Sequence, residues 1–529
     1  MIGIYGFGTL AEIFSLVWIE PLILTLQLMA ISVAIAGCVG IMGAWAASTL
    51  NTYGRLGSWI TAFFLACMVV AVAMPMILHA AAWEATAGKF GWLKMTQTGA
   101  RADGVAFEFF RGLLACGWIH GMFGAAIVSL ATYFGTSATP PALIEQSQME
   151  RGPISTWWQV RLPIALPWIQ ASLMGTAVLA ATEMTVVDLY GYRTIADEFY
   201  LFYATDPSVL SILLTCFFPL AITGGFLTWI SISRRRLIFV QNDHGSDQVS
   251  NGQVPSESMA AVWGWTSGLI AITIACTVTL VPIIGLMAKL GHETVLTDQS
   301  MIARWSSSAA ITRLLEAPSL FLHEYTWTGI IGLVTGLVTV SLAWPLAAFA
   351  RTHPKVETSL NLLTVFAFVM PGPIVGLAIV SLFQMPFPIL HMVYQQTIFP
   401  TVLALLVRSL PIGYWIMRSG YRGISNSVLE TAEIETGLVQ RIWKIDRPLL
   451  KKSLIGTMIA SALFASGDVP ATLPVIPPGV TTVGTRLFGL LHSGARYQEA
   501  ALALWYVCSV VFITLIWVRH RPASRAKLD

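Results

Sequence analysis

Residues 144–163 read IEQSQMERGPISTWWQVRLP, and residues 429–448 read LETAEIETGLVQRIWKIDRP. The two stretches share four residue types at one spacing, each pair 285 positions apart: Glu145 and Glu430, Gly152 and Gly437, Trp158 and Trp443, Pro163 and Pro448. Each stretch is a polar interlude in a chain made otherwise of long apolar segments. A repeat at a fixed offset indicates two copies of one structural unit.

The composition of the chain is typical of a membrane protein. Of its 529 residues, 56% are hydrophobic and 11% are charged, whereas a soluble domain carries about 25% charged residues. Apolar segments recur along the whole chain at about twenty residues each, which is the length of a membrane-crossing helix. Because these segments are continuously apolar, a β-barrel with alternating polarity is disfavoured. The sequence therefore predicts an all-α polytopic membrane protein.

The apolar segments define eleven candidate spans, and the second half has one more leading span than the first. A twelfth span within residues 2–19 is possible, although Glu12 in the middle of that short run argues against it. The eleven ranges are 22–48, 59–85, 111–135, 166–187, 207–232, 262–289, 326–350, 360–384, 397–418, 449–468 and 499–519.

The distribution of basic residues predicts the orientation. With the N-terminus outside, the cytoplasmic loops contain 19 Lys and Arg residues and the outward loops contain 10. The positive-inside rule favours this arrangement, which places the C-terminus and both repeated stretches in the cytoplasm. The formal net charge of +3 is too small to indicate nucleic-acid binding. The first twenty residues lack a basic n-region, so a cleaved signal peptide is not expected.

The chain divides into two similar halves. We predict a first module at 1–233, a cytoplasmic linker at 234–260 and a second module at 261–529, because spans, polar repeat and further spans follow in the same order in both modules. Each module has a Met-Pro pair within a span, at Pro75 and Pro371. Proline removes a backbone donor and kinks a helix. These two prolines are candidates for the translocation path, and purely structural kinks are the alternative.

Each repeated stretch is predicted to form a short helix, a turn at glycine, a second short helix and a proline that opens the next span. Gly152 and Gly437 are natural C-terminal helix stops, and proline is tolerated in a first helical turn. An ordinary interfacial connector with a tryptophan at the headgroups would explain a single copy. Two copies favour docking to a two-fold symmetric partner.

These loops resemble the cytoplasmic loop of permease subunits of ATP-binding-cassette importers, in which Glu-Ala-Ala is followed by a glycine and then by Ile-x-Leu-Pro. The glutamate of the family stands one position closer to the glycine, where this chain has Gln146 and Thr431. The glycine-to-proline interval is also shorter here. The resemblance implies that each loop fits a separate ATPase subunit, so that two ATPase subunits drive alternating access.

The downstream segments resemble iron(III)-type permeases that fuse both halves in one polypeptide. This resemblance implies iron(III) uptake across a bacterial inner membrane, with a separate periplasmic or extracellular binding protein that delivers the substrate. Thiamine, phosphonate or polyamine import, an ion-coupled secondary transporter and a non-transporting scaffold are the alternatives. The segments that carry the resemblance are Glu183-Met184-Thr185-Val186-Val187-Asp188-Leu189, Arg193-Thr194, Tyr200, Gly467-Asp468, Ile476-Pro477-Pro478-Gly479-Val480-Thr481-Thr482 and Leu491-His492-Ser493-Gly494.

The sequence predicts no enzymatic site of its own. No Gly-x-x-x-x-Gly-Lys-Ser/Thr motif occurs, so ATPase activity is expected in a partner chain. A Gly-x-Ser-x-Gly elbow is also absent. The six cysteines are scattered singly, with no zinc-ligand spacing. We therefore expect no catalytic residue and no cofactor.

Glu183 and Asp468 are the carboxylates of greatest interest for transport. They share the offset of 285 positions, and each follows the loop proline of its half by 20 residues. Ionisable groups at membrane depth tend to face the bundle interior or a wet cavity, and oxygen ligands suit a hard trivalent cation. Capping a helix is the alternative role. Arg408, which lies within a span, is a candidate for an internal ion pair.

Overall fold

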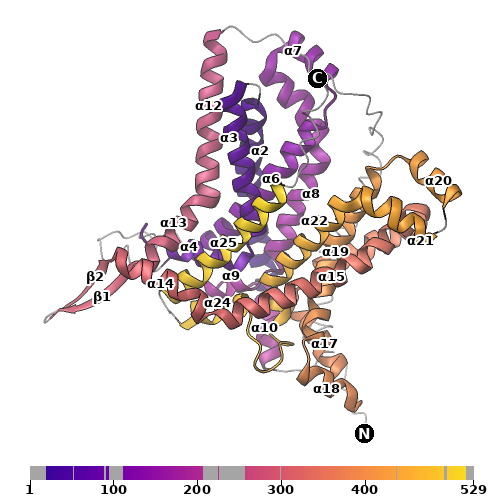
Figure 1. The fold of residues 1–529 in the computed structure, drawn as a ribbon. Coiled ribbons are helices and arrows are strands. Elements are labelled where there is room, and N and C mark those ends of the chain that lie inside the picture. Colours follow the sequence, from indigo (N-terminus) through magenta and orange to yellow (C-terminus); the bar gives the residue numbers. More distant parts are fainter. Residues whose placement is uncertain are drawn as a thin grey trace.

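The computed structural model of the protein describes residues 19–51, 53–88, 91–93, 111–205, 224–225, 257–297, 300–436, 438–493 and 497–519. This part of the chain is almost entirely α-helical (Figure 1), and its one sheet is an antiparallel hairpin of β1 (His292–Thr297) and β2 (Ser300–Trp305). The predicted all-α class is confirmed.

Within the described residues, eight helices are long and apolar enough to cross a membrane, or nine if a bent pair counts as one span. Helix α25 (Gln498–Arg519) adds a shorter apolar helix over Gln498–Ile513. The predicted span 207–232 lies outside the described residues except at positions 224 and 225, and so does the possible span at 2–18. The polytopic membrane architecture is confirmed.

The first half forms a bundle in which small residues allow close helix approach. A Cβ atom on Gly40 would lie 2.6 Å from the Cβ atom of Val128, and the Ser129 hydroxyl donates a hydrogen bond to the Gly40 carbonyl at 3.2 Å. Small residues and interhelical hydrogen bonds are the usual means of association in a bilayer. The bundle contains α2 (Ile19–Leu50), α3 (Gly54–Ala73), α6 (Gly112–Ser137) and α8 (Leu162–Thr182).

The second half repeats this bundle and runs obliquely to the first (Figure 1). Glycine again sets the contact between its first and last long helices, because a Cβ atom on Gly336 would lie 2.8 Å from the Met458 carbonyl oxygen. The helices are α15 (Leu322–Thr352), α16 (Pro354–Val369), α17 (Gly372–Phe383), α19 (Phe399–Arg422) and α22 (Arg447–Gly467). The small helix α18 (Pro388–Gln396) follows α17.

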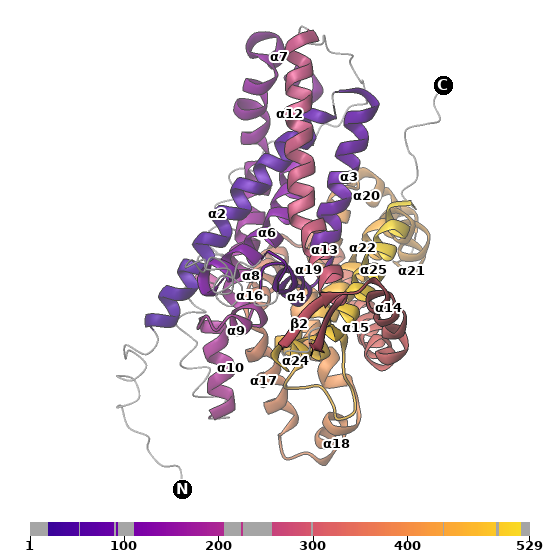
Figure 2. The same ribbon diagram turned by 90° about the vertical axis from the view of Figure 1, so that its left-hand side faces the viewer.

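The extra leading span of the second half packs against the first half. It comprises α12 (Glu257–Ala275), the π-helical turn η4 (Cys276–Leu280) and α13 (Val281–Leu290). Helix α12 stands beside α2 and α3 in Figures 1 and 2, and the Thr279 hydroxyl donates to the Cys67 carbonyl at 3.0 Å. The second half therefore contributes a helix to the packing of the first. Because residues 234–256 lie outside the described part, the linker stays a prediction.

Both predicted proline kinks are complete helix breaks. Helix α3 ends before Met74-Pro75 and α4 (Met76–Ala87) follows, while α16 and α17 meet at Met370-Pro371 with a bend of 100°. Pro75 has no N–H group for the carbonyl of Ala71, one turn back. The His79 ring nitrogen Nε2 lies 2.8 Å from that carbonyl oxygen and satisfies it instead.

Each break packs against the other half. Pro75 touches Gly467 at the end of α22, where any Cβ atom would overlap the proline ring. On the opposite side, Val369 at the end of α16 forms an apolar cluster with Val178 of α8. Both breaks are therefore part of the interface between the halves.

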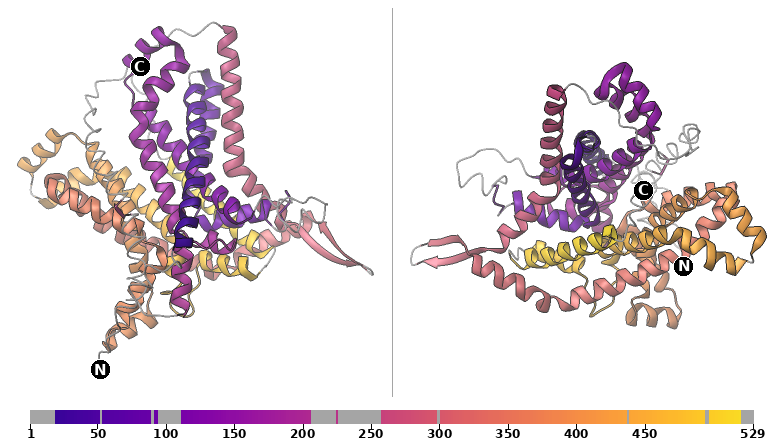
Figure 3. Two further views of the ribbon diagram at one scale, coloured as in Figure 1. Left: turned by 180° about the vertical axis from the view of Figure 1, so that it is seen from behind. Right: turned by 45° about the horizontal axis from the view of Figure 1, so that its top comes forward.

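Residues 292–320 form an appendage that the sequence did not predict. The β-hairpin projects away from the bundles (Figure 3) and leads into α14 (Ser307–Leu320). The Ser306 hydroxyl caps α14 by accepting a hydrogen bond from the Ala309 N–H at 3.3 Å. The Trp305 indole N–H donates to the Ala288 carbonyl at 3.0 Å and ties the hairpin to α13.

Candidate functional site

The first repeated stretch folds as predicted up to its glycine. Helix α7 (Pro141–Thr156) is interrupted at Gly152, whose φ of 77° and ψ of 168° belong to a region that is essentially restricted to glycine. The Thr156 hydroxyl donates to the Gly152 carbonyl at 2.8 Å and lies 3.0 Å from the Ser147 hydroxyl. These bonds hold the two arms of the loop together across the turn.

The second repeated stretch has the same order of elements. Helix α20 (Asn426–Glu435) is followed by α21 (Leu438–Arg441), and both precede the span α22. Gly437, the predicted counterpart of Gly152, lies outside the described residues.

A π-helical turn joins each loop to its span. The turns are η2 (Trp157–Arg161) and η5 (Ile442–Asp446), and they are again 285 positions apart. Pro163 and Pro448 lie at the second position of the α-helix that follows each turn. Both prolines therefore stand in the first turn of the span helix, as predicted, but the π turn joins that helix to the loop without a break. The wider π turn accommodates a proline that lacks an N–H donor, so the helix continues through it.

Exposed apolar side chains on the two loops match position by position. Met149 is 83% exposed and Ile434, its counterpart at the same offset, is 86% exposed. Two further matched pairs are exposed: Leu143 and Val428, Trp158 and Trp443. We call Leu143, Met149 and Trp158 the first loop surface, and Val428, Ile434 and Trp443 the second loop surface. Large apolar side chains exposed on an otherwise polar loop are candidates for contact with a partner.

Sequence reasoning found the tryptophans of these surfaces but missed Met149 and Ile434. The signal was present, because both stand three positions before the repeated glycine. Of the predicted glutamates, Glu430 is exposed and Glu145 is partly buried. Neither side chain lies in the interior of the protein, so both are accessible to a partner.

The second loop is anchored by a buried network. Asp446 of η5 is 1% exposed and accepts a hydrogen bond from the Tyr421 hydroxyl at 3.3 Å, while the Trp344 indole N–H donates to that hydroxyl at 2.9 Å. In the first half, Arg161 stands at the position equivalent to Asp446 and its Nε donates to the Thr136 carbonyl at 3.4 Å. Each π turn is thus fixed to the neighbouring long helix of its own half.

The carboxylate of Glu183, at the far end of α8, caps the N-terminus of a short helix. Helix α9 (Thr185–Leu189) follows it, and the backbone N–H groups of Thr185 and Val186 donate to its two oxygens at 2.8 and 2.9 Å. The ring nitrogen Nε2 of His120 on α6 lies 3.6 Å from the carboxylate. That distance is too long for a hydrogen bond, so the imidazole is an ion-pair partner when it is protonated.

The carboxylate of Asp468 plays the same part at the end of α22. Helix α23 (Val469–Thr472) follows, and the Ala471 N–H donates to Asp468 Oδ1 at 3.2 Å. Arg408 of α19 donates from Nε to Oδ2 at 2.8 Å, and its side chain also donates to the Met370 carbonyl at the proline break. The predicted internal ion pair of Arg408 therefore exists. Its partner is Asp468, which sequence alone did not identify.

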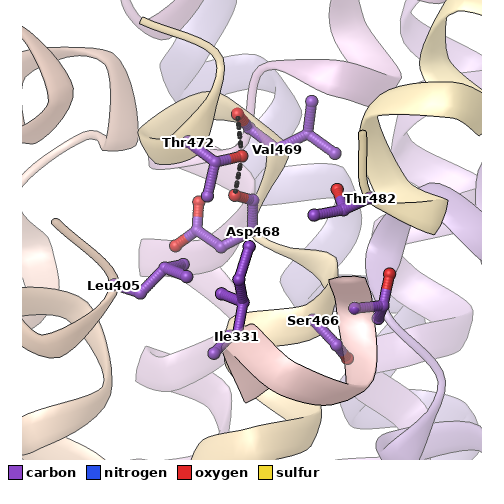
Figure 4. Close-up of a pocket in the computed structure, with 9 residues that line it drawn as sticks. Ile331, Leu405, Ser466, Asp468, Val469, Thr472 and Thr482 are labelled. Carbon is purple, nitrogen blue, oxygen red and sulfur yellow. Dashed lines mark hydrogen bonds between the residues drawn. The ribbon is translucent and has the colours of Figure 1, made fainter. Parts of the chain in front are cut away.

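A small cavity lies beside Asp468 (Figure 4). Its volume is about 10 Å³, the space of about one water molecule. The Thr472 hydroxyl donates to the carbonyls of Asp468 and Val469 at 3.0 and 3.1 Å. The carboxylates of Asp468 and Glu183 both cap a short helix and face a basic group, and within the described ranges no group of three or more His, Cys, Asp or Glu side chains is arranged to hold a metal ion.

Comparison with known proteins found no match. No protein-family model matches the chain, and no curated protein matches it at a significant level. The geometry of the two halves is therefore the basis for a functional proposal.

Proposed function

We propose that this chain is the permease of an ATP-binding-cassette importer in a bacterial inner membrane. The observation that carries the proposal is the pair of loop surfaces, which present the same apolar positions 285 residues apart. Two equivalent surfaces suit a partner with two-fold symmetry, and a pair of ATPase subunits has that symmetry. In this proposal the surfaces are cytoplasmic, as the distribution of basic residues predicts.

Alternating access would follow from movement of the two halves against each other. The proline breaks support this idea, because each one packs on the opposite half at Gly467 or Val178. A change in the separation of the loops would have to be accommodated at these contacts. Iron(III), delivered by an external binding protein, is proposed as the substrate on the sequence resemblance to iron(III)-type permeases.

An ion-coupled secondary transporter is the second candidate. The observation in its favour is the buried His120–Glu183 pair, because titratable groups at membrane depth often belong to proton pathways. Uptake by such a transporter would collapse with a protonophore and would not need ATP.

The decisive experiment is uptake by cells that carry Met149→Asp together with Ile434→Asp. A charge on each loop surface should abolish both uptake of radiolabelled iron and co-purification of ATPase activity, while the thermal stability of the purified chain is unchanged. Ile311→Asp is the matched control, since Ile311 is 60% exposed on α14, away from the loops. Unaltered ATP-dependent uptake by the double variant would exclude the loop surfaces as the docking sites.

A further inference from the structure

A lateral groove runs between three helices of the second half. Its walls are formed by α15, α22 and α25, with Pro318 of α14 at one end, and its volume is about 530 Å³. This volume falls within the range of about 300–1,000 Å³ that is typical of small-molecule sites. The groove is separate from both loop surfaces.

The polar side chains of the groove wall are already satisfied by the protein. The Tyr325 hydroxyl donates to the Leu502 carbonyl at 2.9 Å, and the Trp505 indole N–H donates to the Leu314 carbonyl at 2.6 Å. Ser466 and Tyr506 share a hydrogen bond, and the hydroxyls of Thr328 and Ser509 donate to carbonyls of their own helices. An occupant therefore meets an aliphatic and aromatic wall, with no free polar side chain to recognise a headgroup or an ion.

The groove opens where apolar side chains of membrane-spanning helices are exposed. Two of its lining residues, Leu333 and Ile513, are 49% and 37% exposed, and α15 and α22 are membrane-spanning helices. Exposed aliphatic side chains on such helices contact lipid. The molecules that reach the groove from this side are bilayer lipids, whose acyl chains match the chemistry of its wall.

Glycine gives the groove its depth. Gly329 and Gly332 line it on α15, and a Cβ atom on Gly329 would meet no atom within 4 Å. At Gly329 this side of α15 is therefore open space, whereas one turn further on, at Gly332, it approaches α22, with the Ala462 carbonyl oxygen 3.2 Å from an added Cβ atom. An acyl chain seated there would gain dispersion contacts with the helix backbone, which is the main source of association inside a bilayer.

We propose that this groove binds an acyl chain of a bilayer phospholipid. The bound chain lies between α15 and α22 on one side and α25 on the other. Thr328 and Ser466 also line the cavity beside Asp468, so the lipid packs one side chain away from the Arg408–Asp468 pair. The proposal depends on the membrane-spanning helices and not on the identity of the transported substrate.

The test is photo-cross-linking of the full chain in nanodiscs of phosphatidylcholine that carries a diazirine in the middle of one acyl chain. Mass spectrometry should find more label on the groove peptides of α15, α22 and α25 than on the α12 peptide around Leu269, which is 69% exposed. Gly329→Leu, which fills the groove, should remove this excess. Gly456→Leu is the matched control, because Gly456 also has no neighbour within 4 Å of a Cβ atom and does not line the groove.

A second variant guards against misfolding of the first. Ser509→Phe fills the groove from α25, where Ser509 is exposed, and should also remove the excess label without touching the contact between α15 and α22. Equal labelling of the groove and of the α12 peptide in the unaltered chain would overturn the proposal. Disulfide-linked dimers that form with Ser509→Cys but not in the unaltered chain, which carries the exposed Cys508, would also overturn it, because a second copy of the chain would then occupy the groove.

Discussion

Asp188 of α9 and His492 of α24 (Val483–Ser493) form an ion pair of 3.1 Å that joins the first half to the second. Among the ion pairs between described residues, it is the one that links the two halves. The hydrogen bond that His492 donates to the Asp188 carboxylate raises the pKa of His492 above its ordinary value of 6.5. The interface between the halves therefore contains a histidine whose protonated form is stabilised by its partner.

We expect the chain to lose stability as the pH rises through the raised pKa of His492. A raised pKa means that the folded chain binds the proton more tightly, so the pair stabilises it below the ordinary pKa of 6.5. Because His492 is 40% exposed, the effect should be at most about 1 kcal/mol. Thermal unfolding between about pH 4 and pH 9 measures it, and His492→Gln should flatten the profile above about pH 6.5.

Asp197 on α10 (Ile195–Thr205) needs its own control in that experiment. Burial, followed by the nearby carboxylates of Asp188 and Glu198, raises the pKa of Asp197 from 3.8 to about 6, although Arg193 opposes the shift. The contribution of Asp197 to the stability of the folded chain also falls with rising pH, but it does so between pH 3.8 and about pH 6. Asp197→Asn should remove only the acidic part of the profile. If it also removes the part above pH 7, the pair of Asp188 and His492 is not the source.

Arg408→Ala should destabilise the chain more than His120→Ala. Removal of one partner leaves a buried charge on Asp468, and such changes cost about 3–5 kcal/mol. The His120 ring lies farther from its carboxylate, at 3.6 Å against 2.8 Å for Arg408, and it can be neutral. Unfolding midpoints in detergent provide the comparison. Equal losses of stability in the two variants would contradict the prediction, because the His120–Glu183 pair would then matter as much as the closer Arg408–Asp468 pair. The double variant Arg408→Met with Asp468→Asn should recover part of the stability lost in Arg408→Ala.

Gly152→Ala should deform the first loop through the backbone alone. A Cβ atom at this position meets no other atom within 4 Å, but the φ of 77° is strained for any other residue. The expected cost is about 1–3 kcal/mol, and uptake should fall because the first loop surface moves. Gly175→Ala is the control, since Gly175 also has open space around it in a helix. Equal behaviour of the two variants would argue against a special role for the turn.

Gly467→Ala should push the two halves apart at Pro75. The added methyl group would overlap the proline ring, and overpacking of this kind costs about 1–3 kcal/mol. Spin labels on α4 and α24 should report a longer distance between the halves in this variant. Pro75→Ala in the same chain should restore part of the distance, whereas Pro75→Ala alone should leave the distance unchanged.

Hydrophobic patterning was enough to predict the helical class, most of the spans and both proline breaks. A continuous apolar run is a property of the local sequence, and a proline within such a run removes a backbone donor. Pro345 and Pro411 nevertheless lie inside unbroken helices, so proline alone does not decide where a span breaks. The appendage at 292–320 was missed because short strands and an amphipathic helix leave weak patterns beside long apolar spans.

The partners of the buried carboxylates could not be predicted, because they depend on tertiary packing. Glu183 and Asp468 were found from their offset of 285 positions, but His120 and Arg408 lie at an offset of 288 from each other and come from other helices. The exposure of Met149 and Ile434 could not be predicted for a different reason. Apolar side chains look alike in a sequence whether they end in the core or at the surface.

The π turns make each loop and its span one continuous rod. Residues 153–182 and 438–467 are both helical throughout, at 30 residues each, which corresponds to a length of roughly 45 Å. One end of each rod is an exposed loop, and the other end stops at Glu183 or Asp468. Because the helix is continuous from the residue after the loop turn to the carboxylate, a tilt imposed at the loop end would be carried along the same number of residues to Glu183 and to Asp468.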